Sequence, residues 1–207
     1  ARDIQAWEYV PLGPFTSKSF ATSVSPWVVT IDALEAFRCT SSAGMEQTNP
    51  EPLPYLKDPN YGNSSYNINL KIAIKPEGSD VPYTISTTNF KYMYWNMKQQ
   101  LVHHSVSGAN MQPGDLLGSG TISGTNDVAL GSMLELSWRG AREVKMVDPS
   151  TNETSEDVRK FLKDGDEVIM SGFGANEAGQ RVGFGNVAGK ILPAGSYDAK
   201  PLEAPGK

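Results

Sequence analysis

Several features are scarce in this sequence, and each scarcity excludes a class of protein. Cys39 is the single cysteine, so no disulfide can form within the chain, which favours a reducing compartment. No apolar run reaches the roughly 18 residues that a membrane-spanning helix needs. Lysine and arginine do not cluster, and the net charge of −5 with a pI near 5.1 argues against a nucleic-acid partner. The 207 residues allow one domain with a substantial core. We expect a soluble, cytoplasmic protein without membrane contacts.

Alternation of apolar and polar residues indicates a mainly β chain. From Tyr66 to Ile74, apolar side chains occupy every second position, the period of a strand with one buried face. Short apolar runs between glycine-containing pairs predict further strands near residues 115–123, 131–138, 142–147, 166–172 and 186–192. The polar segments 40–51 and 148–157 are expected to be surface loops. The sequence therefore predicts a mainly β protein with few helices, built as a mixed β-roll or sandwich.

One longer segment has helical spacing instead. Between Thr88 and Val106, large apolar residues recur three to four positions apart, hydroxyl residues offer an N-cap, and Gly108 offers a stop. The same helix would carry His103 and His104. Adjacent helical positions point about 100° apart, so the two imidazoles are not expected to share a site. We assign them structural or capping roles.

Three kinds of polar side chain converge near the start of the chain. If residues 2–9 form a short helix, Arg2, Gln5 and Tyr9 stand three and four positions apart and share one face. A guanidinium, an amide and a phenol together can bind an anionic, oxygen-rich ligand. The alternative is an amphipathic surface helix that ends at Val10, because a residue before proline avoids the helical region. Because the chain begins without methionine, we expect a piece cut from a longer protein within an active site.

Residues 13–27 continue this segment with Lys18 and several hydroxyl side chains in a Ser/Thr-rich loop. The combined segment closely resembles the fumarylacetoacetate hydrolase family. The resemblance runs from Arg2 to Trp27 and resumes in shorter blocks that together span most of the chain. Each block alone has little weight, but their shared order is highly specific. The blocks begin at Pro52, Asn89, Gln99, Pro113, Gly120, Gly131, Asp164 and Gly183.

This resemblance implies a reaction and roles for several residues. The family hydrolyses a carbon–carbon bond of the β-diketone 4-fumarylacetoacetate, which yields fumarate and acetoacetate at the end of tyrosine and phenylalanine catabolism. By resemblance, Arg2, Gln5 and Lys18 would stabilise the oxyanion. Glu135 would orient a catalytic histidine. The residues in contact with the substrate would be Gln5, Tyr9 and Thr121.

Pattern alone gives these residues plainer interpretations. Lys18 lies in a Ser/Thr-rich loop, where a lysine is usually just solvated. Glu135 would lie on the solvated face of a strand, opposite Leu134 and Leu136. Thr121 would simply flank a turn.

The resemblance also implies a calcium or magnesium ion and a homodimer. Lys18 and Thr22 match positions near the family's magnesium site, although an ammonium cannot ligate a cation and Lys18 would have to use its carbonyl. The family's general-base histidine and most acidic metal ligands would lie upstream of Ala1. We therefore expect residues 1–193 to form part of the catalytic domain, followed by a flexible tail at 194–207, and the chain alone to be inactive.

Some positions depart from the family pattern. Ser17 and Ala21 stand where the family usually has glycine, which suits a positive φ or a close approach of backbone to ligand. The loops at 40–51 and 148–157 look longer than usual. Two other functions stay open: a sibling oxo-acid decarboxylase, hydratase or isomerase, and a non-catalytic β scaffold.

Overall fold

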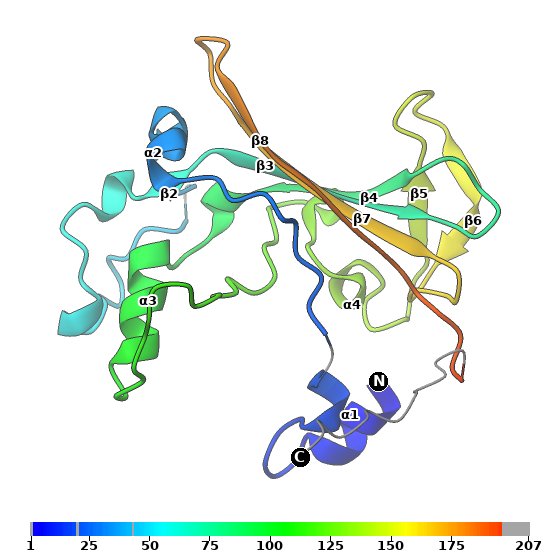
Figure 1. The fold of residues 1–207 in the computed structure, drawn as a ribbon, viewed down its shortest axis with the longest axis horizontal. Coiled ribbons are helices and arrows are strands. Elements are labelled where there is room, and N and C mark those ends of the chain that lie inside the picture. The colour runs from blue at the N-terminus through cyan, green and yellow to red at the C-terminus, as the bar shows by residue number, and fades with distance from the viewer. Residues whose placement is uncertain (1, 20, 43, 196–207) are drawn as a thin grey trace, which may run out of the picture.

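The computed structural model describes residues 2–19, 21–42 and 44–195. Its centre is a six-stranded antiparallel sheet in the order β6-β5-β4-β3-β7-β8 (Figure 1). The strands of this sheet are β3 (Ile68–Lys75), β4 (Tyr83–Asn89), β5 (Val144–Val147), β6 (Thr154–Arg159), β7 (Glu167–Ala175) and β8 (Arg181–Lys190). A two-stranded sheet pairs β1 (Arg38–Cys39) with β2 (Ser65–Tyr66). The predicted mainly β class is confirmed.

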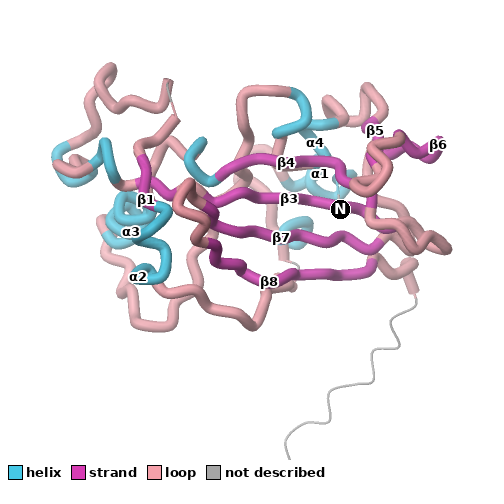
Figure 2. Tube along the Cα trace, turned by 90° about the horizontal axis from the view of Figure 1, so that it is seen from above, coloured by secondary structure: helices cyan, strands magenta, loops and turns pink. Residues whose placement is uncertain are grey.

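The helices are short and lie around this sheet (Figure 2). The α-helices are α1 (Arg2–Glu8), α2 (Ile31–Leu34), α3 (Met97–Ser105) and α4 (Met133–Leu136). The 3-10 helices are η1 (Thr16–Lys18), η2 (Glu35–Phe37), η3 (Pro54–Leu56), η4 (Tyr61–Asn63), η5 (Phe90–Tyr92) and η6 (Asp127–Ala129). None of the helices in the described part of the chain has the length and apolar character needed to cross a membrane.

The clearest predicted strand is confirmed as β3, in the interior of the sheet. It pairs with β4 from Asn69 to Ile74 and with β7 along its whole length. It begins at Ile68 rather than Tyr66, because Tyr66 pairs with Arg38 in the small sheet. The strands predicted at 142–147 and 166–172 correspond to β5 and β7, and the last predicted strand corresponds to β8, which begins earlier, at Arg181.

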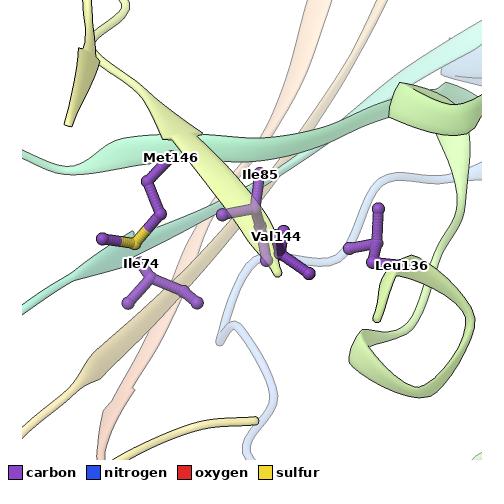
Figure 3. Packing of buried hydrophobic residues seen from close by; sticks show 5 residues of the cluster. All are labelled: Ile74, Ile85, Leu136, Val144 and Met146. Carbon is purple, nitrogen blue, oxygen red and sulfur yellow. The ribbon is translucent and has the colours of Figure 1, made fainter. Parts of the chain in front are cut away.

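Two apolar clusters hold α4 and the α2–η2 segment against the sheet. The first consists of buried side chains from β3, β4, α4 and β5: Ile74, Ile85, Leu136, Val144 and Met146 (Figure 3). Ile74 and Met146 are fully buried, and burying a side chain of this size stabilises a fold by about 1.5–3 kcal/mol. The second cluster joins the α2–η2 segment to the sheet through Leu34, Phe37, Tyr66 and Ile68. The first cluster fixes the position of α4.

The predicted helix at 88–106 is wrong in its first half. Thr88 and Asn89 belong to β4, where they pair with Leu70 and Asn69 of β3, and the helix α3 starts only at Met97. Its N-cap is Asn96, which accepts the Gln99 amide while the Gln99 side chain accepts the Asn96 amide. This capping box satisfies two amide donors at the helix start and sets the boundary that apolar spacing alone misplaced.

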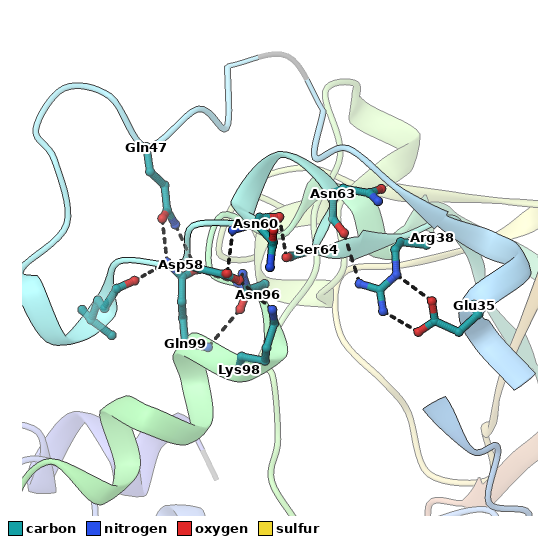
Figure 4. Close-up of polar contacts among 11 residues, drawn as sticks. Glu35, Arg38, Gln47, Asp58, Asn60, Asn63, Ser64, Asn96, Lys98 and Gln99 are labelled. Carbon is teal, nitrogen blue, oxygen red and sulfur yellow. Dashed lines mark hydrogen bonds and ion pairs between the residues drawn. The ribbon is translucent and has the colours of Figure 1, made fainter. Parts of the chain in front are cut away.

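The segment before α3 is tied to the helix by a polar network (Figure 4). Gln99 donates to Gln47 Oε1 at 2.6 Å and to the Leu56 carbonyl at 2.8 Å. Asp58 accepts from Asn96 Nδ2 at 2.9 Å and pairs with Lys98 Nζ at 3.0 Å. The predicted surface loop at 40–51 is therefore anchored to α3 through Gln47.

Three other predicted elements are wrong. Residues 115–123 are irregular rather than a strand, and 131–138 contain the helix α4, because the Ser132 side chain caps the Glu135 amide. The predicted alternation of faces therefore does not exist, and Leu136 and Ser137 are both buried. Part of the predicted loop at 148–157 is β6, which pairs with β5. The predicted tail lies mostly outside the described residues, since 196–207 are not among them.

A buried ion pair fixes β6 to the start of β7. Arg159 and Asp166 are 3% and 1% exposed, and the guanidinium donates from Nε and Nη2 to the two carboxylate oxygens, both at 2.9 Å. The Lys163 amide adds a third bond to Asp166 at 2.8 Å. Burial raises the pKa of Asp166, but the hydrogen bonds from Arg159 and Lys163 outweigh it and hold the pKa below its usual value. The carboxylate is therefore charged at neutral pH.

Candidate functional site

The predicted N-terminal helix is present and lies apart from the sheet strands. The helix α1 ends at Glu8, and the Tyr9 amide continues its hydrogen-bond pattern to the Gln5 carbonyl at 2.9 Å. Gln5 is half-buried and Tyr9 is exposed. Arg2 belongs to α1, but its side chain lies outside the described residues. Gln5 and Tyr9 thus have the helical spacing on which the predicted binding face depends.

Glu8 joins this helix to the turn that carries Lys18. Its carboxylate accepts the backbone amides of Phe15 at 2.7 Å, Thr16 at 3.2 Å and Ser17 at 3.1 Å. It also accepts the hydroxyls of Thr16 and of Ser17, the latter at 2.8 Å. The bond from the Thr16 hydroxyl and then that from the Phe15 amide lower the pKa of Glu8 to about 2. The helix and the turn therefore share one charged anchor.

Lys18 ends the 3-10 turn η1 and is exposed. Its amide donates to the Phe15 carbonyl at 3.1 Å, and this hydrogen bond closes the turn. Ser17 is buried within this turn and is not one of the described residues with a positive φ, so the glycine of the family pattern is not required there by conformation. Thr22 follows in an exposed, irregular stretch. Farther on, the Ser25 hydroxyl donates to the Phe184 carbonyl of β8 at 3.1 Å, which ties this segment to the edge of the sheet.

Glu135 lies in the first turn of α4 with its carboxylate exposed. The Ser132 hydroxyl donates to it at 2.9 Å, and the Ser123 hydroxyl lies 3.1 and 3.0 Å from its two oxygens. An ionised carboxylate has about four lone-pair sites, so Glu135 can accept a further donor such as an imidazole N–H. The arrangement suits the orienting role that the resemblance implies, although the carboxylate stands on a helix rather than on the predicted strand.

Gly131 lets the segment that carries Thr121 lie directly against the residues that precede α4. A Cβ atom at position 131 would lie 2.4 Å from the Ile122 carbonyl oxygen and 2.9 Å from the Thr121 methyl group. The Gly131 amide donates to the Ser123 hydroxyl at 3.1 Å, the same hydroxyl that contacts Glu135. The segment 121–123 and the start of α4 can therefore approach each other only because residue 131 has no side chain.

The candidate residues thus form two groups on one side of the sheet. The first group is Gln5, Tyr9 and Lys18, and the second is Thr121 and Glu135. Figure 1 shows α1 and α4 below the six-stranded sheet, with α4 nearer to it, and Figure 2 places both near β3 and β4 in projection. The two groups come from separate segments, so only the fold brings them to the same side.

The two histidines belong to neither group. The His103 ring stacks on Tyr55, with centroids 6.3 Å apart, and its Nδ1 lies 3.2 Å from the tyrosine hydroxyl. Both histidines nevertheless border one shallow cavity of about 190 Å³ together with Met93 and Trp95, contrary to the expectation that they share no site.

The described residues do not by themselves form a metal site. Among them, no group of three or more His, Cys, Asp or Glu side chains stands close enough to hold an ion. Thr22 offers one exposed hydroxyl, and Lys18 offers a carbonyl oxygen, whereas calcium and magnesium take six or more oxygen ligands, several of them carboxylates or waters. The part of the chain described here does not fit a resident cation without further ligands.

Sequence reasoning missed two residues that organise these groups, Glu8 and Ser123. For the second group the sequence did contain a signal for the helix that carries Glu135, because Ser132 and Glu135 match the capping-box spacing that marks a helix start. For Glu8 there was no local signal, since its bonds go to residues seven to nine positions later.

Comparison with known proteins gives one consistent result. The family model for the fumarylacetoacetate hydrolase C-terminal domain matches residues 1–188. The chain is 54% identical to the fumarylacetoacetase of Bos taurus over 198 residues, which cover 95% of this chain and 44% of the relative. It is 53% identical to those of Caenorhabditis elegans and Homo sapiens, with 94% of this chain and 43% of each relative covered. The chain therefore spans less than half the length of the curated relatives it matches.

Proposed function

Because this chain belongs to the fumarylacetoacetate hydrolase family and matches its C-terminal domain, we propose that it is part of a hydrolase acting on 4-fumarylacetoacetate. The products would be fumarate and acetoacetate, in the catabolism of tyrosine and phenylalanine. The observation that carries this proposal is the identity of about half of all positions to fumarylacetoacetases across nearly the whole chain. The grouping of Gln5, Tyr9 and Lys18 by Glu8 supports it.

In the proposed reaction, water adds to the carbonyl carbon of the fumaryl group, and the carbonyl oxygen becomes an oxyanion. The carbon–carbon bond to the acetoacetate portion then breaks, its electron pair passes to the departing carbon as an enolate, and the proton removed from water ends on that carbon. Both steps concentrate negative charge on oxygen. Lys18 and Gln5 are N–H donors for that charge, and pre-placed donors of this kind contribute about 3–4 kcal/mol each. Arg2 has the same role in the proposal, and Tyr9 and Thr121 contact the substrate.

Glu135 takes the role of an orienting carboxylate for the general base. The base in this proposal is a histidine outside these 207 residues, since His103 and His104 both lie on α3 and belong to neither candidate group. A carboxylate that accepts one imidazole N–H fixes the tautomer and leaves the other nitrogen free to take a proton from water. Ser123 and Ser132 keep Glu135 in one place for this purpose.

Calcium or magnesium, if resident, would be held mainly by carboxylates outside this chain, with Thr22 and the Lys18 carbonyl at the margin of the site. We also place the enzyme in the cytoplasm as a homodimer. The lone thiol of Cys39 supports the cytoplasmic location. The homodimer is supported by large apolar side chains that are exposed near the N-terminus, among them Trp7, Leu12 and Val28, whose exposed fractions are 89%, 79% and 90%.

The test is a product analysis on the full-length protein. We expect fumarate and acetoacetate from fumarylacetoacetate and no pyruvate from oxaloacetate; the reverse would assign a sibling decarboxylase, and turnover of neither would favour a non-catalytic scaffold. Lys18→Ala should lower kcat on the order of a hundredfold to a thousandfold. Lys57→Ala is the matched control, because Lys57 is an exposed cation paired with Glu51. Equal activity of both variants would remove Lys18 from the mechanism.

A further inference from the structure

We propose that Glu8 is a positioning residue for Lys18, whose carboxylate holds the lysine-bearing turn against the helix that carries Gln5 and Tyr9. None of the roles derived above for the oxyanion donors requires a carboxylate at position 8. The catalytic consequence rests on the proposed hydrolase function, whereas the positioning itself is a property of the chain and can be tested without substrate.

The contacts of Glu8 are unusually complete for a side chain outside the core. Three consecutive amides and two hydroxyls, from Phe15, Thr16 and Ser17, point at its two oxygens. Bonds to both oxygens from three successive residues fix the orientation of the turn as well as its distance from α1. Charged acceptors make hydrogen bonds roughly twice as strong as neutral ones. Glu8 is therefore an anchor rather than a solvated helix terminus.

The turn transmits this anchor to Lys18 because it is closed on itself. The Phe15 carbonyl accepts the Lys18 amide at 3.1 Å and the Ser19 hydroxyl at 3.0 Å. The Ser19 amide donates to Thr16 at 3.2 Å. The peptide groups on both sides of Lys18 are thus fixed relative to the three residues that Glu8 binds. The backbone of Lys18 has little freedom left with respect to Gln5 and Tyr9.

Charge makes the anchor persistent under working conditions. With a pKa of about 2, Glu8 stays ionised throughout the pH range in which enzymes normally act. A neutral glutamine of the same shape offers one acceptor oxygen in place of two and presents an N–H₂ group to amide donors. Glu8→Gln should therefore release the turn while it preserves the size and helix propensity of the side chain.

The experiment uses the full-length protein with Glu8→Gln, Ser17→Ala and the control Glu35→Gln. Ser17→Ala removes one hydroxyl bond to Glu8, and Glu35 is an exposed carboxylate paired with Arg38 outside both groups. We expect Glu8→Gln to lower kcat on the order of tenfold to a hundredfold, the usual effect of a small misplacement, with a smaller change in KM. Ser17→Ala should show an intermediate loss and Glu35→Gln none.

Amide hydrogen exchange of residues 15–17 is the second readout and needs no substrate. We expect these amides to exchange faster in Glu8→Gln than in the wild type and in Glu35→Gln. Unchanged exchange in Glu8→Gln, or unchanged kcat despite faster exchange, would overturn the proposal. If the wild type does not cleave fumarylacetoacetate, the proposed function fails, and exchange alone decides whether Glu8 holds the turn. If Glu8→Gln does not fold, Ser17→Ala decides through the same two readouts.

Discussion

At the scale of single residues, carboxylates do most of the organising. Three or more hydrogen bonds reach the carboxylates of Glu8 and of Asp166, and two hydroxyls donate to Glu135. The three carboxylates stand on different segments and differ in burial. Glu8 and Glu135 are reachable by solvent, whereas Asp166 is almost fully buried. The same functional group therefore serves as a local anchor, a candidate orienting group and a core ion-pair partner.

The pKa of Glu8 can be measured directly. Its folded value of about 2 lies below the ordinary 4.5, so the hydrogen bonds stabilise the ionised form. The stabilisation should be complete above about pH 4.5 and should be lost as the pH falls through about 2. A carbon-13 NMR titration of the Glu8 side-chain carboxyl should show this midpoint. A midpoint near 4.5 would mean that the anchor does not form in solution.

Removal of one partner from the buried ion pair should be costly. Asp166→Ala leaves Arg159 buried without its bidentate acceptor, and breaking such a pair costs about 3–5 kcal/mol. Asp157 still contacts the guanidinium, so we expect a loss near the lower limit. Urea unfolding measures the change. Glu51→Ala, which breaks an exposed pair with Lys57, should cost less than about 1 kcal/mol, and a similar loss in both variants would contradict the argument.

At the scale of elements, helix α4 shows how a cap can override an alternating pattern. Residues 131–138 alternate well enough to suggest a strand, but the Ser132 hydroxyl accepts the Glu135 amide and starts a helical turn. Leu136 then packs into the apolar cluster with Ile85 and Val144. As a result Glu135 points toward the segment 121–123 rather than across a sheet.

This junction can be tested at Gly131. Gly131→Ala places a Cβ 2.4 Å from the Ile122 carbonyl, a backbone atom that cannot rotate away. We expect a destabilisation of about 1–3 kcal/mol from overpacking and a loss of activity as Ser123 separates from Glu135. Gly118→Ala is the matched control, because a Cβ there meets nothing within 4 Å. Chemical unfolding and steady-state rates of both variants give the answer, and identical behaviour would show that the close approach is not required.

At the scale of the whole molecule, the described chain presents its candidate groups on one side of the sheet without a complete metal site. The proposed reaction also uses a histidine that these residues do not supply. We therefore expect purified chain 1–207 to show no hydrolysis of fumarylacetoacetate, with or without added calcium or magnesium. The full-length protein assayed in parallel is the positive control. Metal-dependent turnover by the shorter chain would show that its own residues suffice.

Local patterns in the sequence were enough to predict the mainly β class, the position of β3 and the helix at the N-terminus. These features follow from patterns within a few residues: alternation at 68–74, and helical spacing of Gln5 and Tyr9. The resemblance added the candidate residues, including Lys18 and Glu135, because motif order survives where single motifs are ambiguous. Their roles stay predictions.

How these residues are held in place depends on contacts between separate segments of the chain. The bonds of Glu8 to residues 15–17, of Ser123 to Glu135 and of Arg159 to Asp166 join positions that local patterns treat as independent. The end of β4 and the late start of α3 depend likewise on pairing with β3 and on the cap at Asn96. Hydrogen bonds and close packing between segments carry no periodic signal, so only the folded backbone brings their partners within reach.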